Sequence, residues 1–145
     1  MVTDCRGFTM IEVIVVLIII AILAPIVVSR FSTDNTTLVA QTDILKSHLR
    51  YAQIRAMNDT VTWGINIEAS QYSLYQNNVL ATKALPGDNS ATHPLTDGVT
   101  ISSGVQTVTF NEWGSPVSDP LPINLSQPGQ TPIPITITKN TGYIP

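Results

Sequence analysis

The sequence predicts an α+β protein, in which a long N-terminal helix leads into a C-terminal antiparallel β-sheet head. Three observations support this fold class. Residues 8–29 are almost entirely apolar, residues 30–58 repeat small and apolar positions at helical spacing, and residues 59–145 are rich in threonine, valine, isoleucine, glycine and proline. Helices and strands differ in side-chain period, so the change near residue 59 marks the start of the head.

The segment 8–29 is long enough to cross a bilayer, which needs about 20 apolar residues. Its one charged residue is Glu12. A carboxylate inside such a segment is costly unless it is paired, so Glu12 is a candidate functional residue. Arg6 precedes the segment, and a basic residue on that side favours a cytoplasmic N-terminus with the head across the membrane. Pro25 predicts a kink, because it removes a helical hydrogen bond.

Residues 6–12, RGFTMIE, resemble the prepilin cleavage and methylation motif of type IV pilins and type II secretion pseudopilins. The resemblance implies that prepilin peptidase removes the leader 1–7, cutting between Gly7 and Phe8, and that Phe8 is then N-methylated. It also implies a role for Glu12 in assembly with other pilin or pseudopilin subunits. The ammonium group of a neighbouring Phe8 is a natural partner for this carboxylate, because a paired buried charge costs less than a lone one.

A plain membrane anchor, with Glu12 at the level of the lipid headgroups, is the alternative interpretation of the segment. It accounts for the apolar run but not for the motif. The only cysteine, Cys5, lies in the leader, so residues 8–145 can form no disulfide.

Residues 30–58 predict an amphipathic helix that packs on the head. The capping-type residues between Ser32 and Asn35 mark a break or a restart of the helix, and Asn58 and Asp59 end it. One stripe, flanked by Ile44 and Ile54, is expected to face the head. Its members are Leu38, Thr42, Leu45, Leu49, Ala52 and Ala56. Residues 49–57 are similar to a segment of the GspH/FimT group of minor pilins.

Short strands with turns between them are predicted for the head. The expected strands cover 61–67, 72–75, 79–81, 99–102, 106–110, 123–125 and 133–138. Asn77 and Asn78 predict a hairpin turn. Pro134 lacks an amide donor and is expected at a sheet edge or facing out of the ladder. Two loops rich in glycine and proline, Pro86–Gly98 and Gly114–Pro122, are either partner-facing surfaces or solvated linkers.

The order of these strands is similar to the GspH/FimT head, as are Phe110 near Gly114 and the final ITITKNTG run that ends at Gly142. The resemblance implies the pilin fold. FimT-like members that bind DNA do so through basic residues toward the C-terminus, where this chain offers Lys139 alone. Between residues 60 and 145 the only other lysine or arginine is Lys83, and the net charge is −3, so no nucleic-acid partner is expected.

No catalytic residue, metal site or cofactor is predicted. His48 and His93 are far apart in the sequence, and metal and acid–base sites need converging partners. The loop aspartates lack the dense alternation of a calcium loop. These are Asp88, Asp97 and Asp119. Trp63 and Trp113 are expected to pack in the core or on strands.

The resemblance and the lack of chemistry together favour a structural protein rather than an enzyme. The leading interpretation is a minor pilin or pseudopilin of a type IV pilus or a type II secretion pseudopilus. It would be held in the bacterial inner membrane with a periplasmic head and then assembled into a filament. A filament-tip module that binds secreted substrate, DNA or a surface is the alternative, and a single-pass membrane enzyme is a third.

Overall fold

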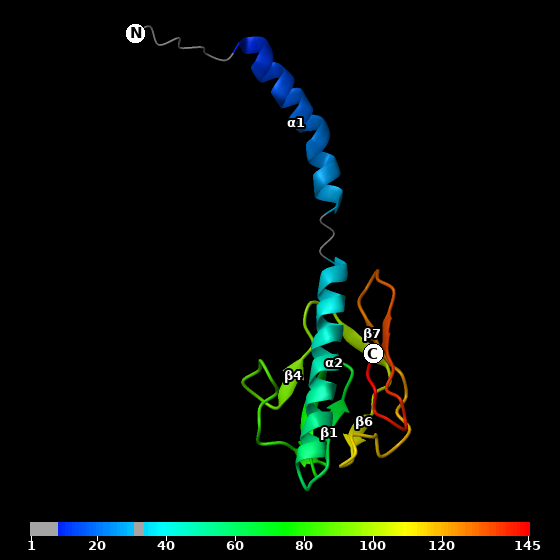
Figure 1. Cartoon of the computed structure of the whole chain (residues 1–145). Helices are drawn as coiled ribbons and strands as arrows, with labels where there is room; N and C mark the ends of the chain where they lie inside the picture. Colours follow the sequence, from blue (N-terminus) through cyan, green and yellow to red (C-terminus); the bar gives the residue numbers. More distant parts are fainter. Residues whose placement is uncertain (1–8, 31–33) are drawn as a thin grey trace, which may run out of the picture. The chain divides into compact units, whose positions relative to one another are not determined.

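The structure is a computed structural model that describes residues 9–30 and 34–145. The chain divides into two compact units, Met1–Thr33 and Asp34–Pro145, and each is described by itself. The elements, in chain order, are α1 (Met10–Arg30), α2 (Asp34–Asn58), β1 (Trp63–Ile67), β2 (Gln71–Gln76), β3 (Val79–Leu80), β4 (Thr92–Pro94), β5 (Thr100–Ser103), β6 (Thr107–Phe110), β7 (Ile123–Ser126) and β8 (Ile133–Ile135) (Figure 1).

Helix α1 carries the apolar segment of the first unit. It begins at Met10, directly after Thr9, and continues through Pro25 to Arg30. The predicted kink near Pro25 stays a prediction. Ser32, part of the expected capping stretch, lies outside the described residues. Helix α2 begins at Asp34, within that stretch, and ends at Asn58 as predicted.

The stripe predicted along α2 is confirmed. All six of its members, Leu38, Thr42, Leu45, Leu49, Ala52 and Ala56, are at most 2% exposed. Gln41 and His48 are buried on the same helix. The flanking Ile54 is half-exposed, as expected for the edge of an amphipathic stripe.

The larger sheet is antiparallel and has β1 at its centre. Strand β1 pairs with β2 on one side and with β6 on the other, and β3 and β4 pair with different parts of the far edge of β2. Asn77 and Asn78 connect β2 to β3, both with positive φ. Two consecutive positive φ angles are the signature of a type I′ hairpin, so the turn predicted at these asparagines is confirmed.

The predicted head sheet is in fact divided in two. Strands β5, β7 and β8 form a separate antiparallel sheet in that order. Pro134 lies in its edge strand β8, opposite Asn124, and is exposed, as expected for a residue without an amide donor. Strand β8 ends at Ile135, which is earlier than the predicted end at residue 138.

The interpretation of Pro86–Gly98 as a continuous loop is wrong, because β4 lies within it. Its three residues pair with β2, and His93 is the partner of Tyr72. A three-residue strand ending in Pro94 shows too little alternation for its sequence to distinguish it from a loop. The strand forms because the edge of β2 offers it hydrogen bonds.

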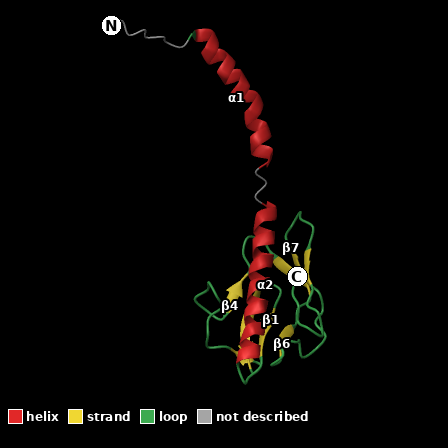
Figure 2. Ribbon diagram, in the orientation of Figure 1, coloured by secondary structure: helices red, strands yellow, loops and turns green. Residues whose placement is uncertain are grey.

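The core of the head lies between α2 and the two sheets. Helix α2 contacts β1 and β6 of the larger sheet and β7 and β8 of the smaller one (Figure 2). Among the largest side chains below 2% exposure are Trp63, Tyr72 and Phe110, which come from three neighbouring strands. Leu45 and Leu49 of α2 belong to the same cluster of buried residues.

Replacing Leu49 with alanine tests this packing. Leu49 is fully buried, so we expect Leu49→Ala to lower the free energy of unfolding by about 2–5 kcal/mol through lost burial and a cavity. The control Val39→Ala lies on the same helix at 47% exposure and is expected to change stability by only about 0.5 kcal/mol. Urea unfolding of both variants, followed by circular dichroism, measures the difference. Equal losses would contradict the assigned face of α2.

Candidate functional site

Of the three residues predicted for processing and assembly, Glu12 alone lies in the described part of the chain. Gly7 and Phe8 lie outside the described residues, so their predicted cleavage and methylation stay predictions. Glu12 is in the first turn of α1, exposed, and two residues after the helix begins at Met10. A carboxylate at this end of a helix is stabilised by the helix dipole.

Thr9 caps the helix that carries Glu12. The backbone N–H of Glu12 donates to the Thr9 hydroxyl at 3.4 Å and to the Thr9 carbonyl at 3.1 Å. This arrangement is one half of a capping box, in which Thr9 is the N-cap and Glu12 the third helical residue. The sequence analysis missed the role of Thr9, although the Thr-x-x-Glu spacing signals it. Helix α1 therefore starts two residues after the predicted cleavage point.

The side chains of α1 from Met10 to Leu23 form a largely apolar surface. The described large apolar residues from Met10 to Leu23 are between 46% and 85% exposed. No helix within the described residues is long and apolar enough to cross a membrane. The predicted span over 8–29 includes Phe8, whose structure is not described, and stays a prediction.

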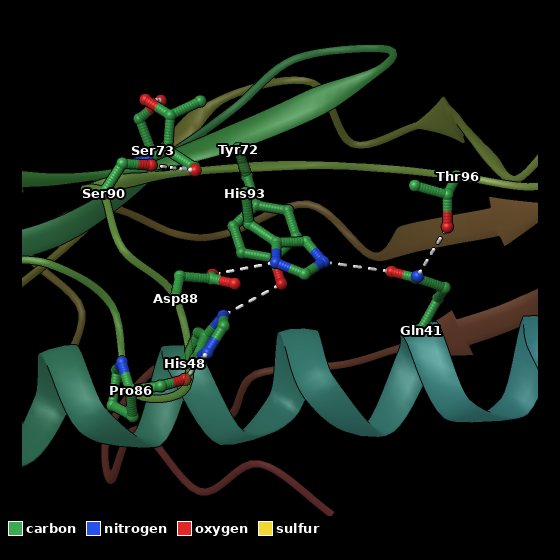
Figure 3. A network of polar contacts seen from close by, with 10 residues as sticks. Gln41, His48, Tyr72, Ser73, Pro86, Asp88, Ser90, His93 and Thr96 are labelled. Atoms are coloured by element: carbon green, nitrogen blue, oxygen red, sulfur yellow. Dashed lines mark hydrogen bonds and ion pairs between the residues drawn. The ribbon is translucent and has the colours of Figure 1, made fainter.

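A buried polar cluster in the head brings together the two histidines. His48 projects from α2, and its Nδ1 lies 2.9 Å from the Tyr72 hydroxyl while its Nε2 lies 2.9 Å from the Pro86 carbonyl oxygen. Figure 3 shows His48 and Gln41 reaching from α2 toward His93. The His48 and His93 ring centroids are 5.6 Å apart.

His93 completes the cluster from β4. Its Nδ1 lies 2.8 Å from Asp88 Oδ2, and its Nε2 lies 3.2 Å from Gln41 Oε1 (Figure 3). The ring also stacks on Tyr72 with a centroid distance of 5.0 Å. The premise that the histidines lack converging partners is therefore wrong. The prediction relied on the distance between the histidines in the sequence. Pairing of β4 with β2 instead places His93 close to His48 of α2.

Burial sets the protonation of two members of this cluster. Removal from water lowers the pKa of His48, an effect reinforced by the nearby His93 and partly offset by the Pro86 carbonyl and Asp88. Burial likewise raises the pKa of Tyr72 well above its usual range, and the Asp88 carboxylate adds to the rise. Both shifts favour the uncharged forms, a neutral imidazole and an intact phenol.

Gln53 of α2 contacts the two loops that contain Gly114 and Gly142. Its amide nitrogen donates to the Gly114 carbonyl at 2.7 Å and to the Gly142 carbonyl at 3.0 Å. Gly142 has φ of +64°, and a Cβ there would clash with the Gly114 carbonyl oxygen and the Gln53 amide. Gly114 and Gly142, two residues that carry the resemblance to the GspH/FimT head, are thus in contact. Their loops meet on α2, and position 142 has no space for a side chain.

The two tryptophans have different environments. Trp63 is 1% exposed, so the prediction of a packed residue is confirmed for it. The same prediction is wrong for Trp113, which is 77% exposed. Strand β6 ends at Phe110, and the Asn111 side chain accepts hydrogen bonds from the backbone of Trp113 and Ser115, which closes a tight turn. Trp113 lines a surface hollow of about 290 Å³ on this turn.

The loop aspartates have separate partners rather than a common ligand. Asp88 bonds to His93, Asp97 accepts from the Thr96 hydroxyl, and Asp119 pairs with Lys139 at 3.0 Å. The pair of Asp119 and Lys139 is largely exposed, so it adds little stability. It does pair Lys139, the one basic residue near the C-terminus that could contact nucleic acid, with a carboxylate.

Comparison with known proteins finds a family motif at the N-terminus and, separately, a similar fold. Residues 3–24 match the family model described as the prokaryotic N-terminal methylation motif, a span that includes Gly7, Phe8 and Glu12. The rest of the chain has an α+β fold with antiparallel sheets, which can be compared with solved structures. No curated protein matches the chain.

Two solved structures have a fold similar to that of this chain. Both are crystal structures of the type IV minor pilin FimU from Pseudomonas aeruginosa PAO1, and their TM-scores are 0.58 and 0.52. Identity is 21% and 20%, the matches cover 78% and 77% of this chain, and each covers 90% of the FimU chain. The likeness confirms the predicted fold class. The narrower resemblance to the GspH/FimT group stays a prediction.

Replacing Gly142 with alanine tests the contact of the two loops. We expect Gly142→Ala to lower the free energy of unfolding by more than about 2 kcal/mol, because both the backbone conformation and the space oppose a side chain. Gly87→Ala is the matched control, since Gly87 also has positive φ but open space around it. That control should cost only about 1 kcal/mol of left-handed strain. Thermal unfolding compares the two, and equal costs would refute the contact.

Proposed function

We propose that the chain is a minor pilin or pseudopilin, a structural and non-enzymatic subunit of a type IV pilus or a type II secretion pseudopilus. One observation carries the proposal. The chain begins with the methylation motif, which runs into an apolar helix whose only acid lies in its first turn. The head that follows in the sequence has the pilin fold. The motif, the apolar helix and the head each have a role in a filament, and none of these roles requires a substrate.

Processing would create the counter-charge that Glu12 needs. Cleavage after Gly7 makes Phe8 the new N-terminus, with an ammonium group at the start of α1. A cation is unfavourable at a helix N-terminus, so a nearby carboxylate would stabilise this group. From Thr9 to Ser29 the chain offers Glu12 as the only acid and no lysine, arginine or histidine. Pairing of Glu12 with the terminus of a neighbouring subunit satisfies both charges and joins the two chains.

The apolar surface of α1 would be covered first by the membrane and then, after assembly, by other subunits. Before assembly, the inner membrane would cover it, with the leader on the cytoplasmic side and the head in the periplasm. In the filament, other α1 helices would cover the same side chains, which are large, aliphatic and exposed in the single chain. The processing partners are prepilin peptidase and its methyltransferase activity, and no nucleic-acid partner is part of the proposal.

Replacing Glu12 separates membrane insertion from assembly. We expect Glu12→Val to remain inserted but to reduce incorporation into sheared filaments by roughly a hundredfold or more, because the neighbour's ammonium loses its buried partner. Glu68→Gln removes an exposed acid of the head and is the control. Immunoblots of the membrane and filament fractions measure the ratio. Normal incorporation of Glu12→Val would refute the charge pair.

Processing is tested by intact mass. Co-expression with prepilin peptidase should remove residues 1–7 and add the mass of one methyl group at Phe8. Gly7→Leu should block both changes, because a bulky side chain replaces the hydrogen of glycine at the cleaved bond. An unchanged precursor mass in the wild type, with the peptidase active on another prepilin, would contradict this part of the proposal.

A further inference from the structure

Three metal-ligating side chains converge in the head, outside the region assigned to assembly. His48, Asp88 and His93 each offer one ligand atom, and these atoms all lie within 4.8 Å of one another. They come from three different segments, namely α2, the segment before β4, and β4 itself. His48 is 2% exposed, and the His93 and Asp88 side chains are 13% and 24% exposed.

The outer nitrogens of both rings are already bound to oxygen acceptors. His48 Nε2 bonds to the Pro86 carbonyl, and His93 Nε2 bonds to Gln41 Oε1. A carbonyl oxygen only accepts, so each Nε2 carries a hydrogen. Metal-binding histidines in proteins show this pattern, in which one nitrogen donates to a carbonyl and the other faces the ion.

The orientation of the Gln41 amide is supported by its other neighbour. Its nitrogen donates to the Thr96 hydroxyl at 3.2 Å, and that hydroxyl in turn donates to Asp97. Thr96 therefore accepts from Gln41, which leaves the amide oxygen facing His93. Gln41 holds the ring in the orientation that turns Nδ1 toward Asp88 and is thus a positioning residue.

His93 Nδ1 and Asp88 Oδ2 need a proton or a metal ion between them. With hydrogens on both Nε2 atoms, a neutral His93 would place the Nδ1 lone pair 2.8 Å from Asp88 Oδ2. Lone pair and carboxylate repel each other unless a proton or a metal ion lies between them. His48 Nδ1 also faces inward, where it accepts a hydrogen bond from Tyr72 (Figure 3).

We propose that His48, Asp88 and His93 form a binding site for a divalent transition-metal ion, with Zn²⁺ as the expected occupant. Two imidazole nitrogens and one carboxylate oxygen are ligands that suit Zn²⁺ rather than Ca²⁺ or Mg²⁺. Three protein ligands leave a fourth position for water. This inference concerns the head alone and does not depend on the filament role.

Binding requires a rearrangement of the cluster, in which the longest ligand separation shortens and the 2.8 Å between His93 Nδ1 and Asp88 Oδ2 lengthens. Ligands about 2.0 Å from a tetrahedral ion lie roughly 3.3 Å from one another, against the present limit of 4.8 Å. Asp88 lies in the segment before β4 and is partly exposed, so it can approach the more deeply buried His48. The Tyr72 hydroxyl, which lies between the rings in Figure 3, would give up its bond to His48 and donate to the fourth ligand.

The first experiment uses the untagged full-length chain in detergent, with Cys5→Ser to exclude the thiol. After removal of metals with a chelator, equilibrium dialysis against Zn²⁺ should give one bound ion per chain. Co²⁺ used as a probe should give the absorption of a tetrahedral site with nitrogen and oxygen ligands. The Tm should rise by roughly 10 °C at a hundred times Kd. Absence of stoichiometric Zn²⁺ at micromolar free concentration, or displacement by millimolar Ca²⁺, would overturn the proposal.

Variants test the assigned ligands. Asp88→Asn and His93→Asn should each weaken Zn²⁺ binding at least tenfold and alter the Co²⁺ spectrum, whereas the control Asp119→Asn removes an exposed aspartate and should bind as the wild type does. Gln41→Met should weaken binding by about 10–100-fold. Circular dichroism of the metal-free variants confirms folding, and the wild-type titration decides the question even if a variant unfolds. Unchanged affinity in Asp88→Asn and His93→Asn would refute the site.

Discussion

One face of α2 is the constraint on which the head depends. An amphipathic helix offers a single apolar stripe, yet two separate sheets contact this helix. They must share the stripe from Leu38 to Ala56. Arg55 lies 4.7 Å from the centre of the Trp63 ring, so β1 starts beside the last turns of α2. The stripe residues in these turns are Ala52 and Ala56, which belong to the same buried cluster as Trp63.

Polar side chains at the margins of this stripe hold the end of the chain. Arg50 donates to the Ile144 carbonyl at 3.0 Å, and Gln53 donates to the carbonyls of Gly114 and Gly142. Within residues 34–145, no backbone N–H outside the helices and strands donates to these three carbonyls, and α2 supplies donors from its side chains. Helix α2 therefore organises the head in two ways, by apolar packing on its stripe and by hydrogen bonds at the stripe's edges.

Local patterns in the sequence predicted much of this fold. A period of three to four residues predicted the buried positions of α2, and Asn77 and Asn78 predicted the turn from β2 to β3. Both signals act over a few residues, which is why the sequence alone could show them. The resemblance of residues 6–12 to the prepilin motif agrees with the match of residues 3–24 to the methylation model.

Pairings between distant segments were not predictable in the same way. The division into two sheets, the strand β4 and the meeting of His48 with His93 all depend on which strand edge is free in the folded head. One signal for the cluster was present in the sequence. Gln41 and His48 alternate with Leu45 and Ala52 at steps of four and three residues, so they lie on the same side of the helix as the buried stripe. Two polar residues on an apolar stripe indicate buried partners, although not their identity.

Glu12 and the cluster around His93 present the same electrostatic problem. Glu12 would be buried in the proposed filament and Asp88 is partly buried in the head, so an unpaired charge on either acid would be costly. For Glu12, the described part of helix α1 supplies only backbone dipoles, and the proposed partner is the ammonium group of Phe8 in a neighbouring subunit. In the cluster, the Nε2 atom of each ring has an acceptor, and His93 Nδ1 and Asp88 Oδ2 need a proton or a metal ion between them. A site completed from outside the chain is stabilised by what binds it, so folding and binding are coupled there.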